Sequence, residues 1–216
     1  MSSAIVFAFF AITMAAPAGA ESIDPESLPW NPAVWTVATT SRAEDGKSQV
    51  IKSRYWLKGK RLRYESYEGD FNGTKLAAAY YDYETKTVIA WDPAKNVYTR
   101  GVLDVTRRRP RDEGWQQAGN EKIAGLSCQV FVQERAKMLP SGKKRAGEAR
   151  EWRHGRFVAK RSVLVERSSV QMLGMVLPVA AQTQTTELQE IKKMPVTDAD
   201  VTPPVEARIV DAAAAK

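Results

Sequence analysis

Short stretches rich in Val, Ile, Thr, Tyr and Trp, separated by turn residues, dominate the chain from about residue 34 to residue 193. Such residues favour β-strands, and strands this closely spaced are usually joined as hairpins, so the pattern predicts an antiparallel meander. Gly59-Lys60 and Asp92–Asn96 look like tight hairpin turns. The predicted strands span residues 34–40, 50–59, 60–68, 75–83, 86–92, 96–102 and 126–135, two strands within 151–169, and 183–193, where a short helix is the alternative.

Several segments interrupt or follow this meander. Residues 103–117 are polar and highly charged, which predicts a loop with at most one helical turn, and the basic segment 139–150 predicts a flexible hairpin loop or insertion. Residues 171–181 hold two methionines and a proline in an apolar run. This run fits a core strand or buried loop, or an exposed apolar flap over a ligand groove or membrane. From Met194 the Pro-rich sequence predicts a docking segment and then a loose tail.

The first twenty residues contain no charge, and their apolar run ends in Pro17 and a small-residue Ala-Gly-Ala. This pattern predicts a cleavable signal peptide and export to the periplasm, with an uncleaved anchor or a buried segment as the alternative. No Lys or Arg precedes the apolar run. The remaining sequence has no second run of spanning length, so we expect a soluble, monomeric mature protein. The expected boundaries are a signal peptide at 1–20, a lead-in at 21–33, a single domain at 34–204 and a tail at 205–216.

The chain has one cysteine, Cys128, and one histidine, His154. If residues 126–135 form a strand, Cys128, Val130 and Val132 share a face, as a buried structural thiol would. A redox or dimerising thiol and a catalytic nucleophile are the alternatives, but neither has a supporting local motif. One His and one Cys cannot supply a zinc site, and the Asp198-x-Asp200 pair lacks the other ligands of a calcium loop. We therefore predict no catalytic residues, no metal, no cofactor and no enzymatic activity.

The formal net charge of +7 is concentrated in two predicted loops. The run at 107–111 contains Arg107, Arg108, Arg109 and Arg111, and a second run occupies 143–145. In an exported protein such loops would meet phospholipid headgroups, lipopolysaccharide or acidic protein surfaces, whereas nucleic acid is excluded by the compartment. The alternative is that both loops are solvated and bind nothing.

The order of these segments resembles the outer-membrane lipoprotein-sorting protein superfamily, the LolA/LolB-like proteins, over residues 34–205. The resemblance implies a mainly β fold: a curved antiparallel sheet of about ten or eleven strands forming a half-open barrel, with a few short helices plugging the opening. The matching segments are "YWLKGKRLRYES" with Arg61 or Arg63, "KTVIAWDPAKNVYTR" with Asp92, Pro93 and Tyr98, "EKIAGLSCQVFVQE" with Gly125, Cys128 and Phe131 or Val132, "EWRHGRFVAKRSVLVER", and "TTELQEIKKMPVTDADVTPP" with Pro203 and Pro204.

An incompletely closed barrel has a concave face that its own side chains need not fill, and an apolar concavity suits acyl chains. The expected function is therefore a soluble periplasmic carrier or binding protein for a lipid, lipoprotein or other amphiphile. The candidate lining residues are Trp56, Trp91, Phe131 and Trp152, for which an ordinary core role is the alternative. The competing function is an envelope interaction or sensor module that binds another protein through its sheet edge or basic loops.

Overall fold

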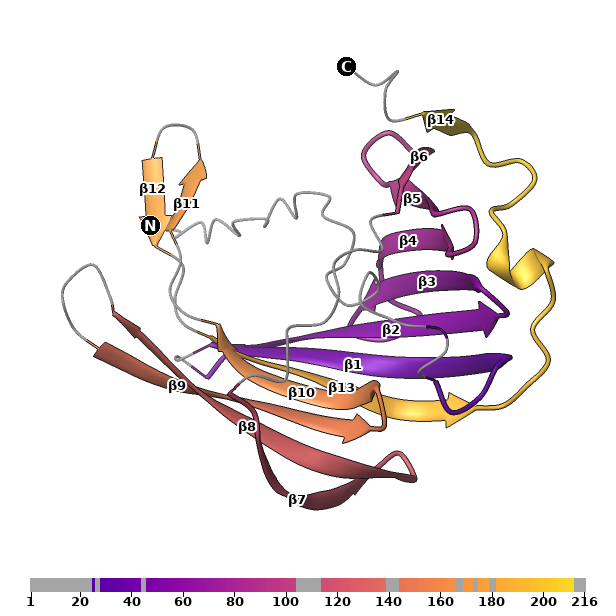
Figure 1. The fold of residues 1–216 in the computed structure, drawn as a ribbon. Coiled ribbons are helices and arrows are strands. Elements are labelled where there is room, and N and C mark those ends of the chain that lie inside the picture. The colour runs from indigo at the N-terminus through magenta and orange to yellow at the C-terminus, as the bar shows by residue number, and fades with distance from the viewer. Residues whose placement is uncertain are drawn as a thin grey trace.

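The computed structural model describes residues 25, 28–43, 46–103, 114–138, 144–165, 169–172, 175–178 and 182–211. Twelve strands form one sheet in the order β14-β6-β5-β4-β3-β2-β1-β13-β10-β9-β8-β7, and β11 and β12 form a separate hairpin (Figure 1). The strands are β1 (Ala33–Ala43), β2 (Ser48–Lys58), β3 (Arg61–Glu68), β4 (Lys75–Asp82), β5 (Thr87–Asp92), β6 (Val97–Val102), β7 (Gln116–Ile123), β8 (Leu126–Met138), β9 (Lys144–His154), β10 (Phe157–Val165), β11 (Ser169–Met172), β12 (Met175–Pro178), β13 (Gln182–Lys192) and β14 (Ile209–Asp211).

The sheet is strongly curved and its two edge strands, β14 and β7, do not pair, so it is not closed into a barrel (Figure 1). Register shifts interrupt the β1–β13, β3–β4, β10–β9 and β7–β8 ladders. Such bulges increase the local twist of a sheet. As a result, Cα atoms of β7 and β13 come within 8 Å of each other although three strands separate them in the sheet. The predicted half-open antiparallel fold is confirmed, with twelve strands in place of ten or eleven.

The helices that were expected to plug the opening have little counterpart among the described residues. There, helical structure is limited to a 3-10 position at Pro25 and the single 3-10 turn η2 (Ala199–Val201), which contacts β2 and β3. Asp198 beside this turn pairs with Lys58 at 3.1 Å. The turn therefore docks the C-terminal segment onto the β2–β3 hairpin.

Both predicted tight turns are present. Gly59, with a φ of 60°, joins β2 to β3, and its backbone N–H and C=O each bond the side-chain amide of Asn31 at 2.8 Å. The Asp92 carboxylate accepts hydrogen bonds from the backbone of Ala94 and Lys95 in the β5–β6 turn. The first of these contacts also fixes the lead-in segment before β1 against the sheet.

Three sequence predictions need correction. Strand β7 begins at Gln116, inside the loop expected at 103–117, and β9 begins at Lys144, inside the loop or insertion expected at 139–150. The expected loose tail contributes β14, which pairs in parallel with β6. The apolar run at 171–181, for which a core strand, a buried loop and an exposed flap were the alternatives, contributes to the hairpin of β11 and β12 outside the main sheet. Two of these segments, β7 and β14, lie at sheet edges, where backbone pairing with a neighbouring strand outweighs weak β-propensity.

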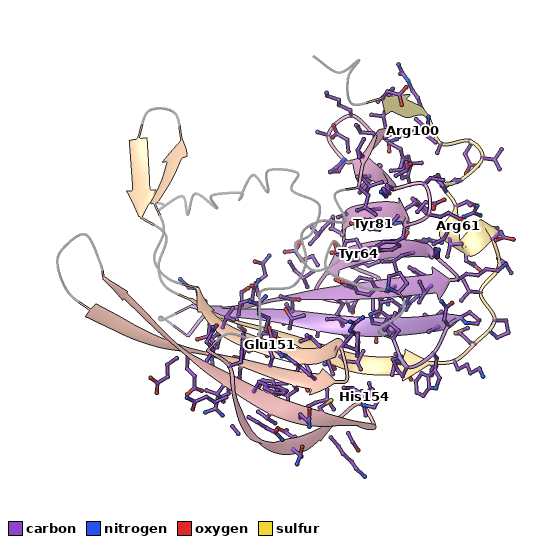
Figure 2. The ribbon with its side chains drawn as sticks, in the orientation of Figure 1. Arg61, Tyr64, Tyr81, Arg100, Glu151 and His154 are labelled. Carbon is purple, nitrogen blue, oxygen red and sulfur yellow. The ribbon has the colours of Figure 1, made fainter. Side chains whose placement is uncertain are left out.

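The strand registers define two faces of the sheet. Residues directly opposite each other on paired strands point to the same side. Figure 2 shows Tyr64, Tyr81 and Glu151 on the side toward the centre of the curve, and His154 at the lower rim. We call this side the inner face. Two rows of paired residues follow it, Trp35–Tyr55–Tyr64–Ala79–Ala90 across β1 to β5, and Ile51–Thr39–Thr186–Arg161–Glu151–Phe131 from β2 to β8.

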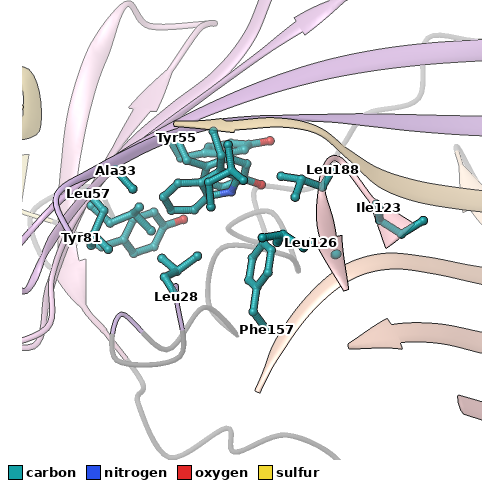
Figure 3. Packing of buried hydrophobic residues seen from close by; sticks show 14 of the residues in the cluster. Leu28, Ala33, Tyr55, Leu57, Tyr81, Ile123, Leu126, Phe157 and Leu188 are labelled. Atoms are coloured by element: carbon teal, nitrogen blue, oxygen red, sulfur yellow. The ribbon is translucent and has the colours of Figure 1, made fainter. Parts of the chain in front are cut away.

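Buried side chains from both halves of the sheet meet in one cluster near the strand ends (Figure 3). Trp35 stacks on Tyr55 with ring centroids 4.8 Å apart, and Tyr55 lies 5.0 Å from Tyr64. Each fully buried large apolar side chain contributes about 1.5–3 kcal/mol to folding, so this cluster dominates stability. The residues contributed by β7 to β10 are Ile123, Leu126, Cys128, Trp152, Phe157 and Ala159.

Candidate ligand-binding face

The four predicted lining residues do not share one face. Phe131 pairs with Glu151 and lies on the inner face. Trp56 pairs with Arg63 and Trp91 follows the inner-face Ala90, so both lie on the opposite, outer face. Trp152 pairs with Val130 and Lys160, on the side of β8–β10 opposite Phe131. Of the four, only Phe131 is therefore placed where a ligand on the inner face could meet it.

Two of the other three have clear local partners. Trp152 is 7% exposed, donates its indole N–H to Glu121 at 2.5 Å, and lies under the ammonium of Lys160 at 5.0 Å. Trp91 donates to the side chain of Asn96 at 3.2 Å and so supports the β5–β6 turn. These contacts account for both residues as structural. The predicted basic-loop residues Arg107, Arg108, Arg109 and Arg111 lie outside the described residues.

The apolar part of the inner face extends beyond the sealed core. Partly buried hydrophobic residues of β1, β4 and β5, and Tyr83 just after β4, pack against the buried cluster from this face. Several are short, and Gly101 on β6, opposite Val88, continues this row without a side chain. Short side chains on a curved sheet leave room above the backbone, as a site for an apolar ligand requires. We call the residues Val37, Ala77, Tyr83, Val88 and Ala90 the apolar row. Between Val37 and Ala77 the same face carries the buried Ser53 and Ser66.

The inner face also carries a charged aromatic group, which we call the inner arginine cluster: Trp115, Phe131, Glu151, Arg153 and Arg161. The Arg153 guanidinium lies 4.5 Å from the Phe131 ring centroid and 5.1 Å from that of Trp115. Glu151 accepts from Arg153 at 2.9 Å through one oxygen and faces Arg161 at 3.4 Å through the other. Side-chain exposure is 12% for Arg153, 13% for Glu151 and 44% for Arg161. One carboxylate thus orients two guanidinium groups.

A second such group, the outer arginine cluster, comprises Trp56, Arg63, Glu65, Tyr67 and Lys75 on β2 to β4. Glu65 is 5% exposed and accepts hydrogen bonds from Arg63, Lys75 and Tyr67 at 2.7–2.8 Å. Burial by itself raises the pKa of Glu65, but the hydrogen bonds from Lys75, Arg63 and Tyr67 outweigh it, so its pKa lies below the ordinary value. The carboxylate therefore stays ionised and anchors the cluster.

The C-terminal segment covers the outer arginine cluster. Arg63 lies over the Trp56 ring at 4.4 Å, and its guanidinium donates to the backbone oxygen of Asp200 at 3.4 Å.

A small cavity of about 100 Å³ is lined by Thr36, Val37, Lys52, Phe71 and Gln189. At that volume it holds a few water molecules and no acyl chain.

The surroundings of Cys128 do not activate it. The thiol is 2% exposed and points to the Leu126 carbonyl at 3.5 Å, which confirms the predicted buried position. Burial, assisted by the negative charge of Glu121, raises the pKa of Cys128 above its ordinary value. His154, the other residue of a conceivable thiol pair, contacts the Ser127 carbonyl at 2.9 Å. Within the described ranges, no three His, Cys, Asp or Glu residues are grouped to hold a metal ion, and no helix is long and apolar enough to cross a membrane.

No protein-family model matches the sequence, and no curated protein sequence matches it. Solved structures with a similar fold include an uncharacterized conserved protein from Thermus thermophilus, at 13% identity and a TM-score of 0.47, covering 83% of this chain and 91% of that chain. A LolA superfamily protein from Nitrosomonas europaea has 14% identity and a TM-score of 0.36, with 83% and 94% covered. MucB, solved in complex with MucA(peri), has 14% identity and a TM-score of 0.41, with 83% and 57% covered. LolA-like proteins are thus among the structures that this chain is similar to, at identities that assign no ligand.

Proposed function

We propose that this protein is a non-enzymatic periplasmic carrier or binding protein that holds a lipid, a lipoprotein acyl group or another amphiphile on its inner face. The apolar row beside the sealed core carries this proposal, because its hydrophobic side chains are only partly buried on the concave side of an open sheet. The raised pKa of the buried Cys128 supports a function without thiol chemistry. Export rests on the charge-free, apolar N-terminal sequence.

The direct test is to purify the full chain from the periplasm of an expression host and examine it by native mass spectrometry and lipid extraction. Co-purified acyl-chain species in stoichiometric amounts are expected. Protein that is consistently empty, and that also fails to bind added amphiphiles, would overturn the proposal.

A matched pair of variants assigns the binding face. Ala90 lies on the inner face of β5, and its neighbour Ile89 lies on the outer face of the same strand. Ala90→Phe fills space above the short side chains and should weaken amphiphile binding roughly tenfold, equivalent to about 1.4 kcal/mol of binding free energy. Ile89→Phe adds bulk at the same level of the sheet and should leave binding unchanged. Equal effects of the two substitutions would contradict binding on the inner face.

The exposed edge of the sheet favours a second function, an envelope interaction module. In the described sheet β7 pairs only with β8, and most of its side chains are exposed. An unpaired strand edge can accept a strand from a partner protein. The bulge between Gln117 and Gly119 and the exposed Glu121 and Lys122 oppose such pairing. Acyl-free protein in the lipid-extraction test would leave this second function as the better explanation.

A further inference from the structure

We propose that the inner arginine cluster is a subsite for an anionic headgroup, so that the preferred ligand is an amphiphile whose phosphate or carboxylate gives its headgroup a net negative charge. This inference rests on the proposed function, since the cluster lies on the same face as the apolar row. Thr39, on the inner face of β1, belongs to the same row of paired residues as Arg161 and Glu151. Val37, two residues before Thr39, is part of the apolar row. An amphiphile needs these two kinds of surface side by side.

The spacing of the two surfaces follows from the sheet. Thr39 pairs with Thr186, and Thr186 pairs with Arg161, so β1 and β10 are two strand spacings apart. At about 4.8 Å per strand, the guanidinium row begins about 10 Å from the apolar row of β1. The hydroxyls of Thr39 and Thr186 lie 3.2 Å apart between them. This order of apolar, hydroxyl and cationic groups matches the order of tail, ester and charged headgroup in a lipid.

The charge of the cluster favours an anion. Glu151 is the acidic member, and it lies within 4 Å of two guanidinium groups, Arg153 and Arg161. The Arg161 guanidinium has five N–H donors in a fixed plane, more than its contact with one carboxylate oxygen of Glu151 uses. Arg161 approaches Glu151 through Nε and is 44% exposed. Phosphate and carboxylate groups are the ligands that such a fork binds with two parallel hydrogen bonds.

The aromatic rings hold the site in place before a ligand arrives. Arg153 lies over both Trp115 and Phe131, with its guanidinium 5.1 Å and 4.5 Å from the two ring centroids. Stacking fixes the plane of a guanidinium and lowers the entropy lost when it binds an anion. Phe131, the one predicted lining residue on the inner face, therefore acts here as a support for Arg153.

The test compares two short-chain lipids with identical tails, dihexanoyl phosphatidylglycerol and dihexanoyl phosphatidylcholine, by isothermal titration of the full chain. Both headgroups contain a phosphate, but in phosphatidylcholine the choline cation balances its charge. The wild type should therefore prefer the anionic lipid about tenfold, and Arg161→Gln should abolish that preference by weakening phosphatidylglycerol binding more than phosphatidylcholine binding. Arg100→Gln is the matched control, because Arg100 is also about half exposed and pairs with one carboxylate, that of Asp211 at 3.6 Å, but lies on the outer face. It should retain the full preference. Raising the salt concentration should reduce the preference of the wild type and of this control, and should have no such effect in Arg161→Gln.

Arg153→Lys gives a second measurement, since it keeps the charge and loses the planar fork. The preference should then fall by about threefold without a change in net charge. Inorganic phosphate, with no tail, should not displace the anionic lipid at comparable concentrations. Equal binding of both lipids by the wild type, or an unchanged preference in Arg161→Gln, would overturn the headgroup inference while leaving the carrier function standing. Displacement by inorganic phosphate at lipid-like concentration would show a free-anion site instead. Binding of neither lipid, by protein that also purifies free of acyl-chain species, would refute the carrier function itself.

Discussion

The outer and inner arginine clusters share one construction. In each, an arginine pairs with a glutamate two residues away on the same strand and lies over aromatic rings: Arg63 with Glu65, and Arg153 with Glu151. Alternate residues of a strand share a face, so this spacing brings opposite charges together in any strand. The two clusters differ in what lies above them.

The outer cluster is held by the C-terminal segment, and its glutamate is fully used. Glu65 accepts three hydrogen bonds, and Arg63 reaches the carbonyl of Asp200 in η2. The inner cluster has an exposed guanidinium, Arg161, on the concave side. An Arg–Glu pair therefore binds the C-terminal segment in the outer cluster, whereas in the inner cluster it leaves a guanidinium exposed. Burial and neighbouring segments, and not the pair itself, decide the role.

The largest expected difference is in stability. Glu65→Gln removes the charge that three donors share in a buried position, and we expect it to lower the free energy of unfolding by about 2 kcal/mol. Glu151→Gln keeps an amide oxygen that can still accept from Arg153, and its second partner Arg161 is 44% exposed, so this substitution should cost less, about 1 kcal/mol. Urea denaturation of both variants in one buffer measures the difference. Equal losses would mean that the inner cluster is as structural as the outer one.

The pH dependence of that loss provides a sharper test. The pKa of Glu65 in the folded protein is lowered, so its stabilisation is fully present above the unfolded pKa and is lost as pH falls through the folded pKa. The difference between wild type and Glu65→Gln should stay constant from about pH 8 to pH 6 and shrink below about pH 4. Asp82 and Asp200, whose pKa values are also lowered, titrate in both proteins and cancel from the difference. A difference that grows on acidification would contradict the assigned hydrogen bonds.

Much of this fold is readable from local sequence patterns. In β3, Leu62 and Tyr64 alternate with Arg61, Arg63 and Glu65, and this period-two pattern matches the two faces of the strand. The turn at Gly59 and the buried side of Cys128 also follow from a few adjacent residues. These features depend on backbone conformation and strand period alone, which neighbouring residues determine.

The faces of Trp91 and Trp152 could not be read in the same way. Alternation divides a strand into two sides, but which side is concave depends on pairing with distant strands and on bulges such as the one at Ala159. The same limit hid β7, whose polar sequence becomes a strand by pairing with β8. The Glu151-x-Arg153 spacing was visible in the sequence, yet only the register brings Arg161 and Phe131 beside it.

Removing one aromatic support from each cluster should separate stability from binding. Trp56→Leu deletes the ring under Arg63 and should lower the free energy of unfolding by about 1 kcal/mol, the value of a partly desolvated cation–π contact. Phe131→Leu should change stability by less and instead weaken binding of the anionic lipid, because Arg153 loses part of its support. Thermal unfolding with and without lipid gives both quantities. A loss of lipid affinity in Trp56→Leu would place the ligand on the outer face and so contradict binding on the inner face.

The smallest expected change in stability is that of Arg161→Gln. Arg161 is 44% exposed and its contact with Glu151 is 3.4 Å long, so the pair contributes little in water and the variant should unfold within about 0.5 kcal/mol of the wild type. The guanidinium groups of Arg153 and Arg161 repel each other across Glu151, which offsets part of what the ion pair supplies.

Bound lipid makes the same variant informative. A ligand stabilises the native state by mass action, about 2.7 kcal/mol at one hundred times the dissociation constant, and this increment should fall sharply for anionic lipid in Arg161→Gln. A substitution that leaves the stability of the lipid-free protein unchanged but removes the stabilisation by bound lipid shows that the replaced residue contacts the lipid. If Arg161→Gln instead destabilised the lipid-free protein as much as Glu65→Gln does, both clusters would serve to stabilise the fold.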